Sequence, residues 1–135
     1  MSARILIIED EALVAMELQF VLEDLGHQVV GTAADAASAR EIARENQIDL
    51  ALVDIHLSDG PSGVALGREL AEDQAVTVLF VTANPGMVRQ GLAGAVGVLS
   101  KPTDERGVQA AVDYALGLRR GESHPPAPPE LRAFG

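Results

Sequence analysis

The 135-residue chain contains no cysteine, which excludes disulfide bonds and thiolate metal sites. Aromatic residues make up only 3% of the chain, although 47% of its residues are hydrophobic. The core must therefore be built from Val, Leu, Ile and Ala, a composition typical of parallel strands that are covered by helices. The length suits a single domain of ordinary size.

Positive charge is scarce: the chain has ten Lys and Arg residues and twenty Asp and Glu residues, which gives a formal net charge of −10. Such a surface repels nucleic acid, which is bound through cationic side chains. No apolar run approaches the roughly 18 residues of a membrane span. The first residues do not form a signal peptide, because Glu9 and Asp10 end their apolar run after four positions. We expect a cytoplasmic protein that binds neither nucleic acid nor membrane.

Five short apolar stretches alternate with five stretches of helical pattern. The expected strands cover residues 5–8, 28–33, 49–54, 76–81 and 95–99, and the expected helices cover about 11–25, 36–46, a segment that begins near Val64, 85–92 and a segment that ends near Arg120. Asp35 and Thr103 are the expected N-caps of the second and last helices. This alternation predicts an α/β fold in which helices cover both faces of a parallel sheet.

The first helix carries two apolar stripes. Its main face consists of Val14, Leu18, Val21, Leu22 and Leu25 at helical spacing. Leu13, Met16 and Phe20 form a second stripe on the other side of the helix. Two interpretations stay open: the helix buries more of its circumference than usual, or the second stripe is an exposed docking surface for a partner.

Asp54 closes the apolar strand Leu50-Ala-Leu-Val53 and opens a loop rich in Ser, Asp and Gly. An acid at this place lies at the carboxyl edge of a sheet, where open α/β sheets bind ligands. Considered alone, such an aspartate is more often a helix cap or a turn residue. The other strand ends decide between these two interpretations.

Four of the expected strands end on polar residues: Glu9 and Asp10, Asp54, Thr82, and Lys101. Because the strands are parallel, these residues should share one cleft. Three neighbouring carboxylates repel one another, and a divalent cation relieves this repulsion. Oxygen ligands without cysteine favour Mg²⁺. A metal and an ammonium group beside a carboxylate suit phosphoryl transfer, in which the carboxylate itself can be the nucleophile.

In this order and spacing, the residues resemble the receiver domains of two-component response regulators, over roughly residues 3–120. The resemblance implies a flavodoxin-like fold with strand order 2-1-3-4-5. It implies that Asp54 accepts a phosphoryl group from a histidine of a kinase or a phosphotransfer protein. The same resemblance implies a Mg²⁺ site formed by Glu9, Asp10, Asp54 and the backbone carbonyl of His56. Lys101 would pair with the phosphoryl group, and the hydroxyl of Thr82 would move towards it.

The chain departs from the family pattern at two places. Val98 stands three residues before Lys101, where family members usually carry Tyr or Phe, so the usual coupled movement of a threonine and an aromatic ring cannot occur in that form. The loop after Asp54 reads Leu57-Ser-Asp-Gly-Pro-Ser-Gly63 and lacks the common Met-Pro pair. This loop resembles receivers associated with alphaproteobacterial general stress signalling.

These observations predict a receiver domain over residues 1–121 and a Pro-rich tail or linker over 122–135. We expect a phospho-acceptor switch rather than an enzyme with free substrates, with a phosphodonor that docks near Leu13, Met16 and Phe20 and an output protein that the sequence does not identify. Two alternatives remain: a phosphate sink or shuttle in a phosphorelay, and an interaction module that does not need phosphate.

Overall fold

The computed structural model describes residues 2–57, 62–83, 95–101, 103–121 and 131–133. The strands are β1 (Arg4–Ile8), β2 (Gln28–Ala33), β3 (Leu50–Asp54), β4 (Thr77–Thr82), β5 (Ala95–Ser100) and β6 (Leu131–Ala133). The helices are α1 (Ala12–Asp24), α2 (Ala36–Glu45), α3 (Gly63–Gln74) and α4 (Glu105–Arg119). The helix expected at residues 85–92 lies outside the described residues.

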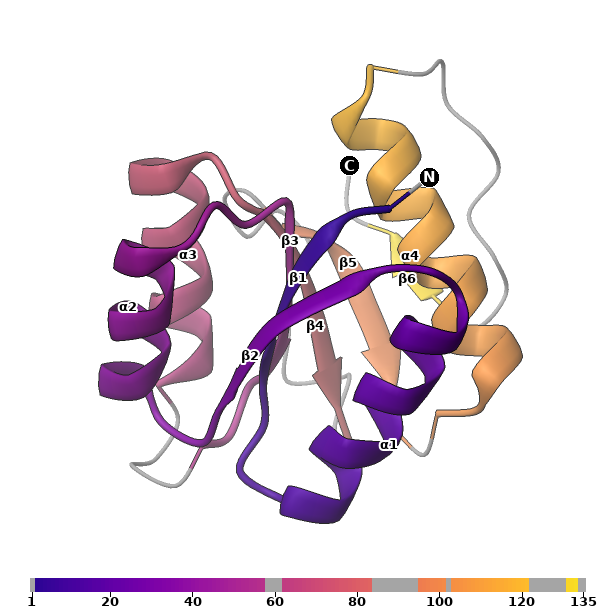
Figure 1. Cartoon of the computed structure of the whole chain (residues 1–135), viewed down its shortest axis with the longest axis horizontal. Coiled ribbons are helices and arrows are strands. Elements are labelled where there is room, and N and C mark those ends of the chain that lie inside the picture. Colours follow the sequence, from indigo (N-terminus) through magenta and orange to yellow (C-terminus); the bar gives the residue numbers. More distant parts are fainter. Residues whose placement is uncertain (1, 58–61, 84–94, 102, 122–130, 134–135) are drawn as a thin grey trace.

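The strands form one sheet in the order β2-β1-β3-β4-β5-β6, and β1 to β5 are all parallel. Helices α2 and α3 cover one face of this sheet, and α1 and α4 cover the other (Figure 1). The predicted fold class and the order 2-1-3-4-5 are therefore confirmed. The order changes direction between β1 and β3, and the crevice outside the carboxyl ends of strands at such a switch point is where doubly wound sheets bind ligands.

Each face of the sheet has its own apolar core. The core beneath α2 and α3 includes Leu6, Ile8, Val53, Leu66 and Phe80. The core beneath α1 and α4 includes Ile5, Ile7, Leu18, Leu79 and Val112. Successive residues of the central strands point to opposite faces, so β1, β3 and β4 are buried on both sides. This double burial explains why their sequences are continuous apolar runs.

The two expected helix caps differ in outcome. The Asp35 side chain accepts a hydrogen bond from the Ser38 backbone N–H at 2.8 Å, so the cap of α2 is confirmed. The prediction of Thr103 as the cap of α4 is wrong: the cap is Asp104, whose Oδ1 accepts from the Gly107 N–H at 2.7 Å. A carboxylate at this position satisfies a free N–H group and also interacts favourably with the positive end of the helix dipole.

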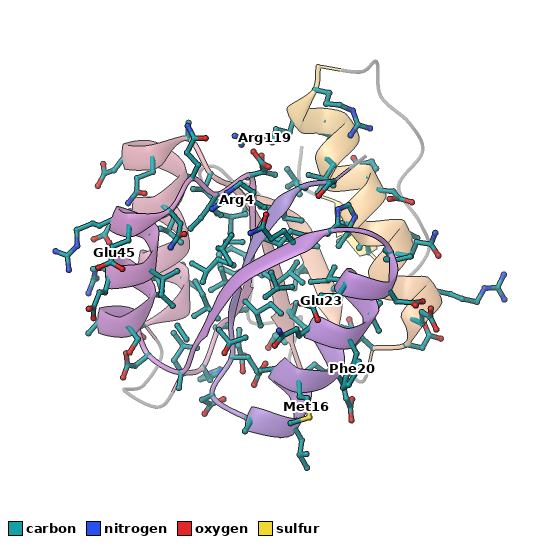
Figure 2. All side chains as sticks on the ribbon, in the orientation of Figure 1. Arg4, Met16, Phe20, Glu23, Glu45 and Arg119 are labelled. Carbon is teal, nitrogen blue, oxygen red and sulfur yellow. The ribbon has the colours of Figure 1, made fainter. Side chains whose placement is uncertain are left out.

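The two stripes of α1 have opposite environments. Leu18 and Leu22 are buried against the sheet. Leu13, Met16 and Phe20 are 72%, 52% and 69% exposed, and Met16 and Phe20 project away from the body of the protein (Figure 2). The interpretation that α1 buries a wider face is therefore wrong, because the side chains of the second stripe are exposed to solvent.

Strand β6 is an addition that the sequence did not predict. It lies within the Pro-rich tail, and it pairs antiparallel with β5. Among the described residues, no helix is long and apolar enough to cross a membrane.

Candidate functional site at the carboxyl edge of the sheet

Glu9 enters the site because β1 ends directly before it. Its backbone N–H still donates to the Ala33 carbonyl at 2.8 Å, which continues the pairing of β1 with β2. The residue is only 4% exposed, and its Oε1 accepts a hydrogen bond from the Glu11 backbone N–H at 3.2 Å. Glu11 is the N-cap residue of α1, so the first carboxylate of the site is held by the start of the helix that follows it.

Asp54 is the last residue of β3, and it is 6% exposed. Its Oδ1 accepts a hydrogen bond from the His56 N–H at 3.2 Å, which fixes the carboxylate relative to the loop. Gly63, at the start of α3, donates its N–H to the Ile55 carbonyl at 3.1 Å. A Cβ atom at Gly63 would lie 2.1 Å from the Asp54 carbonyl oxygen. Only glycine therefore allows α3 to begin this close to Asp54.

Lys101 joins the two buried carboxylates. Its Nζ lies 2.7 Å from Glu9 Oε2 and 3.1 Å from Asp54 Oδ2. Its backbone N–H donates to the Thr82 carbonyl at 2.8 Å, which extends the pairing of β4 with β5 by one residue. Thr82 is 1% exposed and Ala83 is exposed, so the two consecutive residues differ in access to solvent.

The proton affinities of this ion pair are altered. Burial raises the pKa of the Glu9 carboxyl to about 7, although hydrogen bonds from Lys101 and from the Glu11 backbone act in the opposite direction. Burial alone would lower the pKa of Lys101, but its hydrogen bonds to Glu9 and Asp54 outweigh this effect and raise it. The site therefore keeps Lys101 protonated, and its excess negative charge lowers the stability of the fold.

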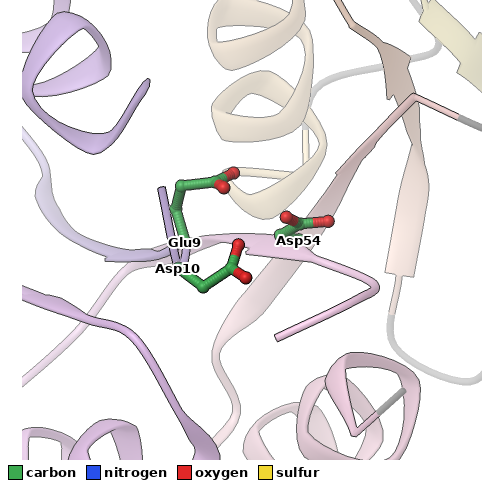
Figure 3. A group of neighbouring side chains, drawn as sticks. All are labelled: Glu9, Asp10 and Asp54. Carbon is green, nitrogen blue, oxygen red and sulfur yellow. The ribbon is translucent and has the colours of Figure 1, made fainter. Parts of the chain in front are cut away.

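Glu9, Asp10 and Asp54 form a group that could hold a metal ion. One carboxylate oxygen from each lies within 4.8 Å of the others, and the three side chains converge from two strand ends (Figure 3). Asp10 is exposed while Glu9 and Asp54 are buried. These oxygens fit the ligand preference of Mg²⁺, which commonly uses few carboxylates and keeps several water ligands. One ammonium beside three carboxylates leaves negative charge for a cation to neutralise.

The acids open onto a cleft of about 340 Å³, lined by Asp10, Glu11, Asp54, His56, Thr82, Ala83 and Lys101. Five of these residues, Asp10, Asp54, His56, Thr82 and Lys101, were predicted site residues, and Glu11 and Ala83 are sequence neighbours of predicted ones. Glu11 was missed because, in the sequence, it reads only as the first residue of a helix. Gly63 was missed because its role depends on the distance between two backbones, which a single glycine in a loop does not reveal.

The exposed stripe on α1 does not line this cleft, but two adjoining surface depressions lead from the cleft to Phe20, one of its three residues. Glu11, Ala83 and Lys101 line the first depression from the cleft side, and Val14, Glu17 and Thr103 line it from the side of α1 and α4. The second depression, of about 330 Å³, continues between α1 and the start of α4, and Phe20 is among the residues that line it. A partner that covers Phe20 could therefore also reach Lys101.

The sequence of residues 5–113 matches the model of the response regulator receiver domain family. The chain belongs to this family. Its fold and its acidic cluster are those expected for a receiver domain.

Two curated relatives are similar to the chain in sequence. The chain is 39% identical over 130 residues to the phyllosphere-induced regulator PhyR of Methylorubrum extorquens, covering 92% of this chain and 49% of PhyR. It is 31% identical over 120 residues to the transcriptional regulatory protein PdtaR of Mycobacterium tuberculosis, covering 87% of this chain and 58% of PdtaR. The chain thus spans about half the length of these relatives.

Solved structures give the same result. The response regulator PhyR from Brucella abortus superposes with a TM-score of 0.80 at 33% identity, covering 90% of this chain and 50% of that one. The receiver domain of Erythrobacter litoralis PhyR has a TM-score of 0.78 at 33% identity, covering 94% and 97%. The chain is therefore similar to PhyR receiver domains in both sequence and fold.

Proposed function

We propose that the chain accepts a phosphoryl group on Asp54 and that phosphorylation switches its contacts with other proteins. The observation that carries this proposal is the position of Asp54: a buried carboxylate at the edge of an open cleft, 3.1 Å from the Lys101 ammonium and clustered with two more acids. The donor would be the phosphohistidine of a histidine kinase or a histidine phosphotransfer protein.

In the proposed reaction a carboxylate oxygen of Asp54 attacks the phosphorus atom of the phosphohistidine. The P–N bond breaks, the imidazole nitrogen keeps the electron pair, and an acyl phosphate forms on Asp54. Lys101 is already within hydrogen-bond distance of Asp54 and would move its ammonium onto the phosphoryl oxygens. The Thr82 hydroxyl would donate to the same group from the end of β4.

Glu9, Asp10 and Asp54, together with the backbone carbonyl of His56, would hold a Mg²⁺ ion. When bound, this ion supplies positive charge to the phosphoryl oxygens during transfer. Glu9 and Asp54 would then exchange part of their interaction with Lys101 for the metal. Lys101 would then be able to pair with the phosphoryl group.

A direct test uses a small phosphodonor, acetyl phosphate, with Mg²⁺. Intact mass spectrometry should show the addition of one phosphoryl group to the wild-type chain and none to Asp54→Asn. Asp73→Asn is the matched control, because Asp73 is an exposed aspartate on α3, away from the cleft. Full modification of the Asp54 variant would refute the assignment.

The exposed stripe Leu13, Met16 and Phe20 is the proposed docking surface for the phosphodonor. It lies on the helix that starts beside the acids, and the surface depressions described above lead from Lys101 to Phe20, one of its three residues. Leu13→Asp and Phe20→Asp should slow transfer from the cognate donor by about tenfold or more, because they place a charge in an apolar interface. Transfer from acetyl phosphate should not change, and an equal loss with both donors would show a defect in the cleft instead.

A phosphate sink or shuttle is the second candidate, and Val98 favours it. This residue is 1% exposed and too small to act as the mobile aromatic ring that many receivers use. A sink would lose its phosphoryl group quickly with little structural change. Comparison of the acyl phosphate lifetime with the conformational response to beryllium fluoride separates a sink from a switch.

The similarity to PhyR supports a role in general stress signalling. Two of the similar structures are described as an anti-anti-sigma factor PhyR and as the PhyR stress response regulator. We infer that this chain receives phosphoryl groups in the same kind of pathway. A kinase panel from a bacterium that encodes the chain, scored by the rate of Asp54 phosphorylation, tests this placement.

A further inference from the structure

The outer edge of β5 is covered by the chain's own C-terminal strand. β6 pairs antiparallel with β5, with Leu131 opposite Leu99, Arg132 opposite Val98 and Ala133 opposite Gly97. Without β6, β5 would be the last strand of the described sheet and would present unpaired backbone N–H and C=O groups. This edge of the sheet can therefore bind an extended segment, and β6 is the segment that binds it here.

Leu131 anchors this strand. Its side chain is 5% exposed and belongs to the same apolar core as Leu99 and the α4 residues Val108 and Val112. Leu99 lies two positions before Lys101, so the anchor sits at the end of β5 that leads into the cleft. The tail thus contacts the sheet close to the proposed phosphorylation site.

The attachment of β6 is small compared with that of the other strands. Within the residues that the structure describes, it pairs over three positions and along one side, whereas β1, β3 and β4 have partners on both sides. Segments with few buried contacts and few hydrogen bonds open at a much lower free energy than the core of the same domain. We therefore expect β6 to open at a lower free energy than the central strands.

β5 also connects β6 to the charged residues of the cleft. Leu99 pairs with Leu131 on one side and with Val81 of β4 on the other. The next pair along β4 and β5 is Thr82 with Ser100, and Lys101 follows with its N–H bonded to the Thr82 carbonyl. Lys101 and Thr82 are therefore joined to Leu99, the residue that pairs with Leu131, through adjacent positions of β4 and β5.

We propose that the outer edge of β5 is a strand-binding site, that β6 occupies it in the unphosphorylated chain, and that phosphorylation of Asp54 releases β6. This inference rests on the proposed function. It supplies an output that needs no aromatic ring at Val98. The released edge would be open to strand addition by an extended partner segment with an apolar side chain at the place of Leu131.

Hydrogen exchange of the full chain, followed by mass spectrometry, tests the proposal. With Mg²⁺, addition of beryllium fluoride should accelerate exchange in β5 and β6 by about tenfold, as expected when a local segment opens. Unchanged or slower exchange in both strands, with clear protection around Asp54, would overturn the release of β6 and leave the proposed function intact. Absence of any response around Asp54 would overturn both.

Variants of Leu131 provide the second arm. Leu131→Asp should release β6 without beryllium fluoride, and by reciprocity of coupling it should bind beryllium fluoride with Mg²⁺ about threefold more tightly than the wild type. Leu131→Ala should act in the same direction with a smaller effect and covers the case in which the aspartate variant does not fold. Leu131→Met, which conserves volume, should behave as the wild type. Equal affinity in all the variants that fold would overturn the coupling.

Discussion

The two edges of the parallel sheet use the same kinds of charged residue for different purposes. At the amino edge, Asp49 accepts a hydrogen bond from the Arg4 backbone N–H at 2.9 Å and lies 3.8 Å from the Arg119 guanidinium. Arg119 also donates to the Ala75 carbonyl at 2.7 Å and to Thr77 Oγ1 at 3.1 Å. At the carboxyl edge, three acids share one described ammonium, that of Lys101.

The difference lies in the charge balance. The charged groups of the amino edge join β1, β3, β4 and α4 through partners that each residue already has, so they stabilise the fold. The carboxyl edge carries surplus negative charge in a partly buried place. Burial is the main cause of the raised pKa of Glu9, and the charge of Asp54 acts in the same direction, while Lys101 opposes both. Such an arrangement costs stability, and it is useful where a cation and a phosphoryl group are to be bound.

Replacement of the positively charged side chain at each edge, Lys101 or Arg119, should give the largest contrast in stability. Lys101→Met leaves the buried carboxylates of Glu9 and Asp54 without the ammonium that neutralises them. At pH 8 without metal, the free energy of unfolding should fall by about 3 kcal/mol, as for a buried ion pair that loses one member. Mg²⁺ should recover part of this loss. Chemical denaturation with and without Mg²⁺ measures both effects.

The control for Lys101→Met is Arg119→Met at the amino edge. Arg119 is partly exposed, and its loss should cost about 1 kcal/mol, the net value of a hydrogen-bonded contact. This loss should not depend on Mg²⁺. If Mg²⁺ stabilised both variants equally, the surplus of negative charge at the carboxyl edge would not explain the cation dependence.

Glycine substitutions sharpen the comparison further. Gly63→Ala would place Cβ 2.1 Å from the Asp54 carbonyl oxygen and 2.8 Å from Ile55 Cα, so α3 must move away from β3. We expect a loss of about 2–3 kcal/mol in unfolding free energy, the usual cost of overpacking. Mg²⁺ affinity should fall as well, because Asp54 moves with the backbone; calorimetry measures the binding.

Gly26, at the amino edge, is the matched glycine. It has φ +93°, and a Cβ atom added there would have no other atom within 4 Å, so Gly26→Ala introduces backbone strain without a steric clash. It should cost about 1–2 kcal/mol through this strain and leave Mg²⁺ affinity unchanged. A Mg²⁺ defect in Gly26→Ala as large as that in Gly63→Ala would mean that general loss of stability, rather than the position of Asp54, controls binding.

The elements that the sequence predicted well are those with strong local signals. The apolar runs of β1, β3 and β4 are buried on both faces, and the polar residues that end them mark the strand ends directly. The predicted cap of α4 lies one residue too early, because Thr103 and Asp104 are both good caps and only the backbone geometry selects Asp104. Strand β6 was missed because its pairing with β5 is a long-range contact made by three residues, too few to show a periodic pattern.

The proton affinity of Glu9 gives a prediction for the carboxyl edge alone. Its folded pKa of about 7 lies above the ordinary value of 4.5, so the stability that the proton contributes is present below pH 4.5 and is lost as the pH rises through 7. Mg²⁺ must displace this proton. Its affinity should therefore rise by up to about tenfold per pH unit towards pH 7 and level off above it.

Glu9→Gln removes the titrating group while keeping a similar shape. This variant should bind Mg²⁺ more weakly at pH 8 and should show a much flatter dependence of affinity on pH between 5.5 and 7, the range set by the shift of Glu9. Calorimetric titration at several pH values measures the slopes. A slope in Glu9→Gln as steep as in the wild type would assign the titration to another group.

His27 should give the smallest effect, and it belongs to the amino edge. Its Nδ1 accepts a hydrogen bond from the Ala3 backbone N–H at 3.1 Å, and burial lowers its pKa below 6.5, although Asp113 acts in the opposite direction. Above pH 6.5 the ring is neutral in both states. As the pH falls below 6.5, the unfolded chain takes up the proton first, so stability should decrease, by no more than the roughly 1.4 kcal/mol per pH unit that one group allows. His27→Gln, whose side-chain oxygen can accept the same hydrogen bond, should remove this decrease and leave Mg²⁺ affinity at pH 8 unchanged. Denaturation from pH 7.5 to 5.5 measures the decrease. If the wild type and His27→Gln lost the same stability, the acid sensitivity would be assigned to the acids of the cleft and not to His27.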